Sequence, residues 1–306
     1  MSGINLRHNP RTSRWMNILF HTFNNAFLLL AMLITLYPVL NTVAISFNDG
    51  TDALRGGISI WPRVFSLESY RGVLADEFVF SAFQVSVART LLQTALNLLL
   101  TSMLAYALSR REYVLRKFIT TVFVLTMYVN AGLIPNYLLI SRTLGLSRSF
   151  WVYIVPTMIS CFNMIVIRTY ILNLPDALVE SARIDGAGEL RVFWQIIAPL
   201  CLPVMATVSL FVAVGAWNSW FDTHLYNAGR PSLHTLQYLL KMKLATTQAS
   251  SNMAMQTTTA LAARAPTTPV TIRAAITVIS ALPIMLVYPF LQKYFVVGLS
   301  IGSVKG

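Results

Sequence analysis

Residues 180–199 have the sequence ESARIDGAGELRVFWQIIAP and lie between two long apolar runs. A helix is expected to begin close to residue 174, just before a proline that suits a first helical position. Gly186 and Gly188 then end or bend this helix, since glycine adopts left-handed backbone angles at little cost. Glu189 opens a second helix. The stretch therefore predicts a bent pair of helices that joins one apolar run to the next.

The rest of the chain is apolar and poor in charge. Of its 306 residues, 56% are hydrophobic and 11% are charged, whereas an ordinary soluble domain has about 25% charged residues. A helix needs roughly 20 apolar residues to cross a hydrocarbon core about 30 Å thick. The sequence therefore predicts an all-α integral membrane protein, a single domain over 1–306, with six transmembrane helices near 23–47, 79–108, 118–140, 151–171, 202–221 and 274–293.

The distribution of Lys and Arg predicts the orientation, because cytoplasmic loops carry an excess of these residues. The dense cluster RREYVLRK at 110–117 lies between the second and third predicted spans. It places its own loop in the cytoplasm, together with both termini and the loop 172–200. The segment 48–78 is then a short folded loop on the outside. The long loop 222–270 is also outside, and its leucine-patterned first part is expected to dock a partner.

Several kinds of chemistry lack their sequence patterns. The chain has no GxxxxGK[ST], so it has no phosphate-binding loop of that class. Its four histidines show no metal-ligand spacing, and no serine stands in GxSxG. We therefore expect no catalytic residue, no metal site and no cofactor in this chain. Cys161 and Cys201, which lie at different predicted depths, are expected to be free thiols.

Charge also limits the class of partner. The formal charge of +12 is spread along loop edges, where a membrane topology accounts for it, so nucleic acid is not expected as a partner. None of the six predicted spans contains Asp or Glu. Carriers driven by protons or sodium commonly hold the ion with an intramembrane carboxylate. Ion-coupled transport is therefore disfavoured.

Arg89 lies near the middle of the second predicted span. An intramembrane cation is a functional candidate, because burying it without a partner costs several kcal/mol. Two interpretations stay open: Arg89 lines a polar path, or it pairs structurally with backbone carbonyls or a neighbouring subunit. Gln84 and Gln93, spaced five and four residues from it, are expected on roughly the same helix face.

Other polar and aromatic candidates lie in the fourth and fifth spans. In the fifth, the stretch WNSWFD at 217–222 reaches the outer membrane boundary. Its tryptophans either anchor the protein at the interface or offer a stacking surface for a sugar ring. The candidate translocation path then comprises Gln84, Arg89, Gln93, Asn163, Trp217 and Asn218.

The first helix of the loop 172–200 combines small or apolar residues with charged ones. Its small and apolar members are Ala177, Leu178, Ala182 and Ile184. A helix that fits into a groove of another protein needs such a surface, which favours docking. A short amphipathic helix that lies on the bilayer is the alternative.

This loop resembles the EAA loop of permease subunits of ABC importers, which reads Glu-Ala-Ala, three residues, Gly, nine residues, then Ile-x-Leu-Pro. Glu180, Ala182, Gly186, Ile196 and Pro199 fall at those spacings, whereas Ser181 replaces the middle Ala and Ala198 the Leu. The DGA of 185–187, WNSWFD and the ending GLSIGSVKG resemble the MalG-like permeases of the carbohydrate-uptake subfamily. The Ala/Thr-rich outer loop and YPFLQKYFVVG are similar to permeases for complex or acidic oligosaccharides, alginate importers among them.

The resemblance implies a type I ABC importer permease fold in the bacterial cytoplasmic (inner) membrane. It implies that the protein translocates oligosaccharides of an acidic, alginate- or pectin-like kind. The implied partners are an extracytoplasmic solute-binding protein, a second, MalF-like permease subunit, and two ATPase subunits that carry ATP and Mg. It implies that Glu180 pairs with a basic residue of the ATPase. The implied ATPase-coupling residues are Glu180, Ser181, Ala182, Asp185, Gly186, Ala187, Ile196 and Pro199, and the tail contact is Gly302, Ser303, Val304, Lys305 and Gly306.

Two alternatives stay beside the sugar importer. One is an ABC permease for another solute class, such as amino acids or peptides, with the same architecture. The other is a membrane scaffold or channel that has no ATPase partner.

Overall fold

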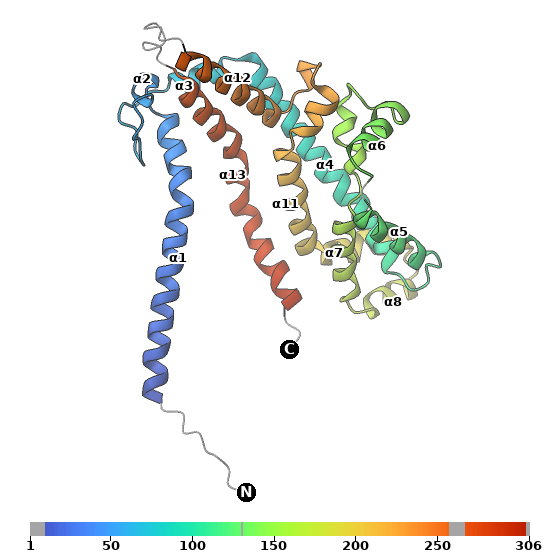
Figure 1. Cartoon of the computed structure of the whole chain (residues 1–306). Coiled ribbons are helices and arrows are strands. Elements are labelled where there is room, and N and C mark those ends of the chain that lie inside the picture. Colours follow the sequence, from blue (N-terminus) through green and yellow to red (C-terminus); the bar gives the residue numbers. More distant parts are fainter. Residues whose placement is uncertain (1–9, 130, 257–266, 304–306) are drawn as a thin grey trace. The chain divides into compact units, whose positions relative to one another are not determined.

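The computed structural model describes residues 10–129, 131–256 and 267–303, and Figure 1 shows its helices. Over these residues every regular element is helical, apart from an isolated bridge between Asn48 and Phe65. The predicted all-α fold class is confirmed. Contacts within the chain divide it into two compact units, residues 1–72 with 250–278 and residues 73–249 with 279–306. Each unit is described by itself, and the single domain over 1–306 stays a prediction.

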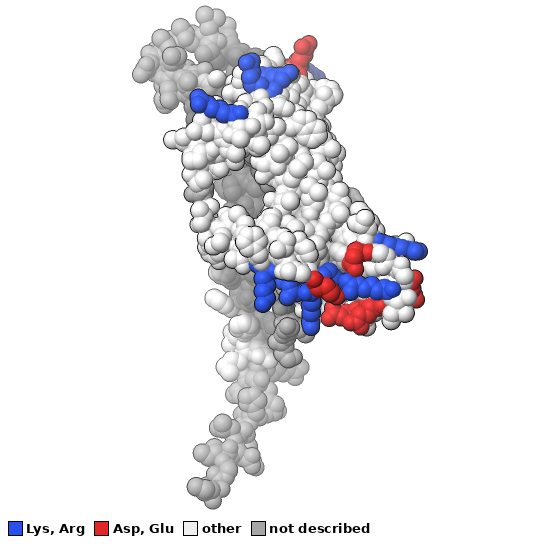
Figure 2. All heavy atoms as spheres, turned by 90° about the vertical axis from the view of Figure 1, so that its right-hand side faces the viewer, with Lys and Arg blue, Asp and Glu red and all other residues white. Residues whose placement is uncertain are grey.

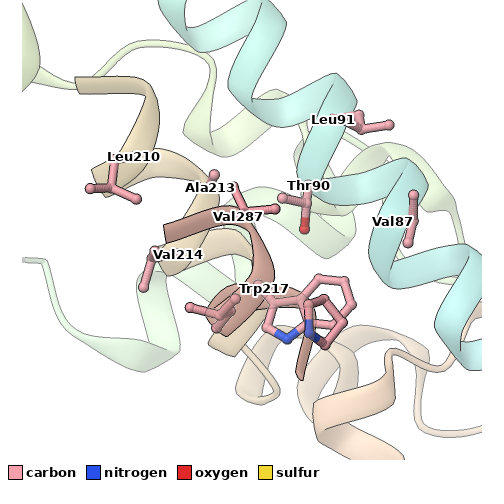
Figure 3. Close-up of a pocket in the computed structure, with 10 residues that line it drawn as sticks. Val87, Thr90, Leu91, Leu210, Ala213, Val214, Trp217 and Val287 are labelled. Carbon is pink, nitrogen blue, oxygen red and sulfur yellow. The ribbon is translucent and has the colours of Figure 1, made fainter. Parts of the chain in front are cut away.

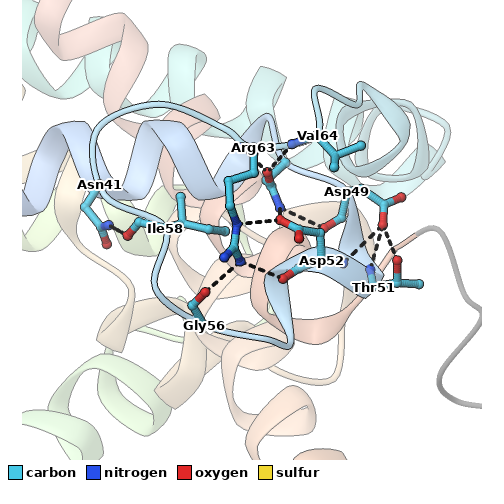
Figure 4. Close-up of polar contacts among 9 residues, drawn as sticks. Asn41, Asp49, Thr51, Asp52, Gly56, Ile58, Arg63 and Val64 are labelled. Carbon is cyan, nitrogen blue, oxygen red and sulfur yellow. Dashed lines mark hydrogen bonds and ion pairs between the residues drawn. The ribbon is translucent and has the colours of Figure 1, made fainter.

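The first unit holds α1 (Pro10–Ser46), α2 (Gly50–Ala53) and the start of α3 (Glu68–Leu74). Polar side chains fold the segment between α1 and α3 (Figure 4). Asn48 Oδ1 accepts hydrogen bonds from the backbone N–H groups of Arg63 and Val64 at 2.8 and 3.0 Å. Hydrogen bonds from Asn48 and Arg63 to Asp52 hold the pKa of that carboxyl below its usual range. The segment 48–78 is therefore folded, as the sequence predicts, and its place on the outside stays a prediction.

The second unit is built around α4 (Glu77–Ser109), which packs against α7 (Cys161–Leu172) and α11 (Leu202–Asn218). Its shorter helices are α5 (Arg116–Tyr128), α6 (Leu133–Leu138), α8 (Ala177–Ile184), α9 (Glu189–Val192) and α10 (Ala198–Leu200). Both α12 (Leu236–Gln256) and α13 (Pro269–Ser303) continue from one unit into the other. The core of the second unit gathers buried apolar side chains of α4, α7, α8, α9 and α11, among them Leu108, Ile167, Val179, Val192 and Val208.

Within the described part of the chain, three helices are long and apolar enough to cross a membrane: Met16–Ser46, Glu77–Ser109 and Pro269–Val287. Three more candidates are bent pairs of helices, which make six crossings if each pair is one span. They are Arg116–Tyr128 with Leu133–Thr143, Phe150–Thr157 with Cys161–Leu172 (bent by 46°), and Glu189–Leu200 with Leu202–Asn218 (bent by 80°). On the face that carries α5, α6 and α8, charged side chains gather at two levels with an uncharged band between them (Figure 2). That banding is typical of a protein whose middle lies in lipid.

The break before α7 departs from the unbroken span predicted over 151–171. The first half of that span is two 3-10 turns, and Pro156 in the second turn has no N–H to donate. The break between the second turn and α7 also interrupts the helical hydrogen bonds, and in lipid a freed backbone carbonyl must find a partner within the protein. Asn97 Nδ2 supplies it by donating to the Thr157 carbonyl at 2.7 Å, and Asn163 Nδ2 donates to Asn97 Oδ1 at 3.3 Å. The two asparagines therefore stabilise the break.

The described part of loop 222–270 is more helical than predicted. Its leucine-patterned part begins α12, with Leu236, Leu239 and Leu240 buried, and the helix continues through the Ala/Thr-rich part to Gln256. Residues 257–266 lie outside the described part of the chain. Cys161 and Cys201 are free thiols, as expected.

Candidate functional site

The stretch 180–199 forms the bent helical pair that the sequence predicts. The first helix, α8, begins at Ala177 rather than near residue 174. It ends in a turn where Gly186 has a φ of 79° and the Ala187 N–H donates to the Ala182 carbonyl at 2.9 Å. A left-handed residue closed by such a bond is a common helix terminator. Because α9 follows directly at Glu189, Gly186 and Gly188 lie in the corner between the two helices, as predicted.

The two faces of α8 differ in exposure. Val179 and Ala182 are buried in the core that α4 and α7 share. Ala182 was expected on the docking surface, so this expectation is corrected: its methyl group faces the protein's own interior. Ile184, 86% exposed, stands with the exposed side chains of Glu180, Ser181 and Asp185 on the outer face. Among the described residues, Glu180 has no ion-pair partner.

The other predicted coupling residues lie around this helix pair. Gly186 and Pro199 are exposed, whereas Ala187 and Ile196 are half-buried. Of the predicted tail contact, Gly302 and Ser303 end α13. The tail residues Val304, Lys305 and Gly306 lie outside the described part of the chain.

Arg183 ties α8 to its surroundings. Its Nη1 lies 2.8 Å from Glu112 Oε1, and its Nη2 lies 2.8 Å from Glu189 Oε1. Tyr106 of α4 donates its hydroxyl to Glu189 Oε2 at 2.6 Å. The hydrogen bonds to Glu112 and Glu189 raise the pKa of Arg183, and the bond from Arg183 lowers the pKa of Glu112. We call Tyr106, Glu112, Arg183 and Glu189 the Arg183 cluster; it connects α8, α9 and the C-terminal end of α4.

A cavity of about 440 Å³ adjoins the Arg183 cluster. The cluster's four side chains line it together with Arg110 and apolar residues of α4 and α9. Arg110 lies with its guanidinium 4.9 Å from the centroid of the Tyr106 ring. The cavity is therefore charged on one wall and apolar on the other.

Arg89 has a partner in its own chain, which neither sequence interpretation identified. It is 2% exposed, and its guanidinium faces Asp222: Nη1 lies 3.1 Å from Oδ1, and Nη2 contacts Oδ2. Nη1 also donates to the Ser219 carbonyl at 3.3 Å, and the guanidinium lies 4.7 Å from the centroid of the Tyr153 ring. Arg89 is thus buried, neutralised and enclosed, so an attraction of acidic sugar by this cation gains no support.

The sequence did not identify Asp222 as the partner because this residue lies just beyond the fifth predicted span, which ends at residue 221. The available signal was its place in WNSWFD, one residue beyond that span. An acid at a membrane boundary and a cation within the membrane suggest a pair, because each lowers the desolvation penalty of the other.

The remaining predicted path residues do not form one path. Gln93 is buried beside Arg89, with its Oε1 3.5 Å from the Arg89 Nε. Gln84 is exposed, because five residues advance a helix by about 500°, roughly 140° from the starting direction. Asn163 is engaged by Asn97, as described above. The predicted common face for Gln84 and Arg89 is therefore corrected.

Trp217 and Asn218 also differ in their placement. Trp217 is buried and donates its indole N–H to the Ser280 carbonyl at 2.9 Å, whereas Asn218 is exposed. Trp217 lines a cavity of about 200 Å³ between α4, α11 and α13 (Figure 3). Apart from Thr90, its walls are apolar, with Val87, Leu91, Leu210 and Val287 among them. A sugar needs hydrogen-bonding groups for its hydroxyls, so Trp217 gains no support as a sugar platform.

No group of three or more His, Cys, Asp or Glu residues in the described ranges could hold a metal ion. The expectation that this chain carries no cofactor stays a prediction.

Comparisons with known proteins place the chain in a family. The family model described as "Binding-protein-dependent transport system inner membrane component" matches residues 97–301, more than half of the chain. The polygalacturonan/rhamnogalacturonan transport system permease protein YtcP of Bacillus subtilis (strain 168) is 35% identical over 95% of this chain and 99% of its own length. Protein LplC of the same organism is 36% identical over the full length of both chains.

A solved structure is similar along nearly the whole chain. It is a crystal structure of a bacterial ABC transporter involved in the import of the acidic polysaccharide alginate. The likeness has a TM-score of 0.81 and 26% identity, and it covers 92% of this chain and 98% of that one. The type I permease fold expected from the EAA resemblance is thereby confirmed, as is a multi-pass protein of the inner membrane. The chain belongs to the family of inner membrane components of binding-protein-dependent transport systems.

Proposed function

We propose that this chain is a permease subunit of an ATP-driven importer of oligosaccharides and that α8 is the element through which ATP hydrolysis acts on it. The observation that carries this proposal is the two-faced structure of α8. Its inner residues, Val179 and Ala182, are fixed in the core shared with α4 and α7, while its outer acids, Glu180 and Asp185, face solvent. A force applied to the outer face would therefore reach the membrane helices.

The energy comes from other subunits in this proposal. The sequence has no phosphate-binding loop of the GxxxxGK[ST] class, so ATP and Mg are assigned to two separate cytoplasmic ATPase subunits. ATP binding closes the ATPase pair, α8 moves with it, and the membrane path changes from inward-facing to outward-facing. The ATPase must grip α8 differently in the two states, or ATP could not shift their populations.

The proposed assembly has further members. Family membership makes a solute-binding protein a partner. We infer that it docks on the outer side, where loop 222–270 lies if both termini are cytoplasmic. A second, MalF-like permease subunit would complete the path. The tail 302–306 would reach the ATPase pair.

The substrate we propose is an acidic, alginate- or pectin-like oligosaccharide. One relative is named for polygalacturonan and rhamnogalacturonan, and the similar solved transporter imports alginate. Both groups of sugars carry uronate carboxylates. A different solute class, such as peptides, is the alternative.

Reconstitution tests this function. The chain is purified with the second permease subunit, the ATPase subunits and the binding protein, and ATP hydrolysis is measured with uronate oligomers, neutral oligosaccharides and peptides. We expect uronate oligomers to stimulate hydrolysis and to accumulate in the vesicles. Stimulation by peptides but not by sugars would overturn the substrate class, and a stable chain that binds no ATPase subunit would overturn the importer itself.

A further inference from the structure

We propose that Trp220, Phe221, His224 and Lys241, which we call the outer aromatic surface, bind a uronate unit of the oligosaccharide at the outer end of this subunit. The proposal rests on the proposed function, since it takes the substrate to be an acidic sugar. It moves the sugar contact from the buried Trp217 to Trp220 and Phe221 of the same stretch, together with His224 and Lys241 beyond it.

The rings of this surface form a connected set. Ring centroids are 5.6 Å apart for Trp220 and Phe221, and 6.1 Å apart for Trp220 and His224. Phe221 is 44% exposed, His224 is exposed and Trp220 is half-buried. Aromatic side chains in this partly exposed state offer apolar contact area with little loss of rotamer freedom. The C–H face of a pyranose ring is a ligand that suits them.

Lys241 adds the charge that a uronate needs. Its ammonium nitrogen lies 5.0 Å from the centroid of the Trp220 ring, and the side chain is exposed. Among the described residues it has no carboxylate partner, whereas Lys243, two positions further along α12, lies 2.6 Å from Asp76 Oδ2. The charge of Lys241 is therefore available to a carboxylate that comes from outside the chain.

Two amide side chains close in sequence to Trp220 and Lys241 offer hydrogen-bonding groups for sugar hydroxyls. The Gln237 amide nitrogen is 3.5 Å from Asn218 Oδ1, and the Asn218 side chain is exposed. The combination of rings, amides and one cation is what recognition of a charged sugar requires: apolar faces for the ring, amides for hydroxyls and a cation for the carboxylate.

The fold holds this surface in place. Asp222, between the surface residues in sequence, turns inward to Arg89. The hydroxyls of Thr223 and Thr235 form a hydrogen bond at 3.0 Å, and the Tyr153 hydroxyl donates to the Leu233 carbonyl at 2.7 Å. The backbone that carries Phe221 and His224 is thus fixed before any ligand arrives, which lowers the entropy lost on binding.

Further exposed cations of the second unit add to the positive charge of Lys241. Arg142, Arg148 and Arg230 are exposed and, like Lys241, have no carboxylate partner among the residues that the structure describes. An excess of exposed cations attracts anionic ligands and raises their association rate. The ordinary alternative is that Trp220 and Lys241 anchor the protein at the membrane interface, a role that does not depend on the charge of the substrate.

The test compares Lys241→Gln with Lys241→Arg and Lys243→Gln in the complete transporter. Lys241→Arg keeps the charge, and Lys243→Gln removes an equal charge from the same helix without touching the outer aromatic surface. Binding of short uronate oligomers to the complex in nanodiscs is measured without the binding protein, next to the same oligomers with methyl-esterified carboxylates. Phe221→Ala tests the ring contact independently of charge.

We expect Lys241→Gln to weaken binding of the uronate oligomer about three- to fivefold, the upper range for an exposed charge pair, and to leave the neutral ester unchanged. Lys241→Arg and Lys243→Gln should bind as the unaltered protein does, and Phe221→Ala should weaken both ligands. Equal binding by Lys241→Gln and the unaltered protein would overturn the inference while leaving the importer intact. An interfacial anchor would instead reduce the amount of assembled complex and affect both ligands alike. If the unaltered transporter neither binds nor imports uronate oligomers, the acidic substrate itself is wrong.

Discussion

Asp222→Asn is expected to destabilise the protein more than any substitution of an exposed acid, because it leaves Arg89 charged and buried without its counter-ion. The exchange is close to isosteric, and the amide can still accept the hydrogen bond that the Thr223 N–H donates to Asp222 at 2.8 Å. What it removes is the negative charge that faces both terminal nitrogens of Arg89.

The magnitude follows from burial. Arg89 is 2% exposed, and the side chain of Asp222 is 22% exposed, so water can compensate little of the lost charge. Removing one partner of a buried ion pair costs about 3–5 kcal/mol. For a domain of this size, about 2–4 °C of melting temperature correspond to 1 kcal/mol, which gives a decrease of roughly 6–20 °C. Arg89→Gln combined with Asp222→Asn removes both charges and should recover most of the loss.

The assay is thermal unfolding of the purified protein in detergent. The fraction of protein that stays monodisperse is measured as the temperature is raised. Glu68→Gln is the control, since Glu68 and Arg71 are 44% and 72% exposed and such a pair contributes about 1 kcal/mol or less. A decrease below about 2 °C for Asp222→Asn, or a double variant as unstable as the sum of the two single variants, would refute the buried pair.

Three further predictions concern the corner after α8, the solvent-exposed face of α8 and the N-terminal end of α4. Gly186→Ala should cost about 1–2 kcal/mol in the unfolding equilibrium, because the residue has a φ of 79°, and should lower uptake. Glu180→Lys should abolish sugar-stimulated ATP hydrolysis in the reconstituted complex while leaving membrane insertion unchanged; normal hydrolysis would contradict the docking role. The hydrogen bond from Lys243 lowers the pKa of Asp76. The stability that this pair adds is therefore present above about pH 4 and is lost as the pH falls through the lowered pKa. Thermal unfolding measured against pH should show this loss, and Asp76→Asn should remove it.

Much of this fold could be predicted from sequence because its causes are local. Apolar length places the long helices, and glycine at 186 and 188 places the corner of the coupling stretch, since backbone freedom at a glycine does not depend on distant contacts. The break in the span 151–171 has a distant cause: Asn97, 60 residues before Thr157 in the chain, accommodates the freed carbonyl. Composition alone cannot distinguish such a broken span from a straight one.

The candidate site was predicted less completely for the same reason. Arg89 could be identified from its position, but its partner lies 133 residues away in the chain. The face of α8 was also ambiguous, because alanine fits a docking surface and a protein core equally well. Only the packing of Val179 and Ala182 against α4 and α7 shows which face is internal.

Two contacts of α4, one near its C-terminal end and one near its middle, bear on how the proposed movement could be transmitted. Near its C-terminal end Tyr106 bonds to Glu189 and thereby to the Arg183 cluster, and further along the same helix Arg89 is paired with Asp222. A helix that is held at one position only could move there without displacing the residues that lie further along it. Because α4 is held by charge-assisted contacts at both positions, displacement of α8 has a direct route to the segment that carries Trp220, Phe221 and His224. On the proposed function, the ATPase contact and the sugar contact are therefore joined by a single helix, and the Arg89–Asp222 pair connects the middle of that helix to the segment that carries the sugar contact.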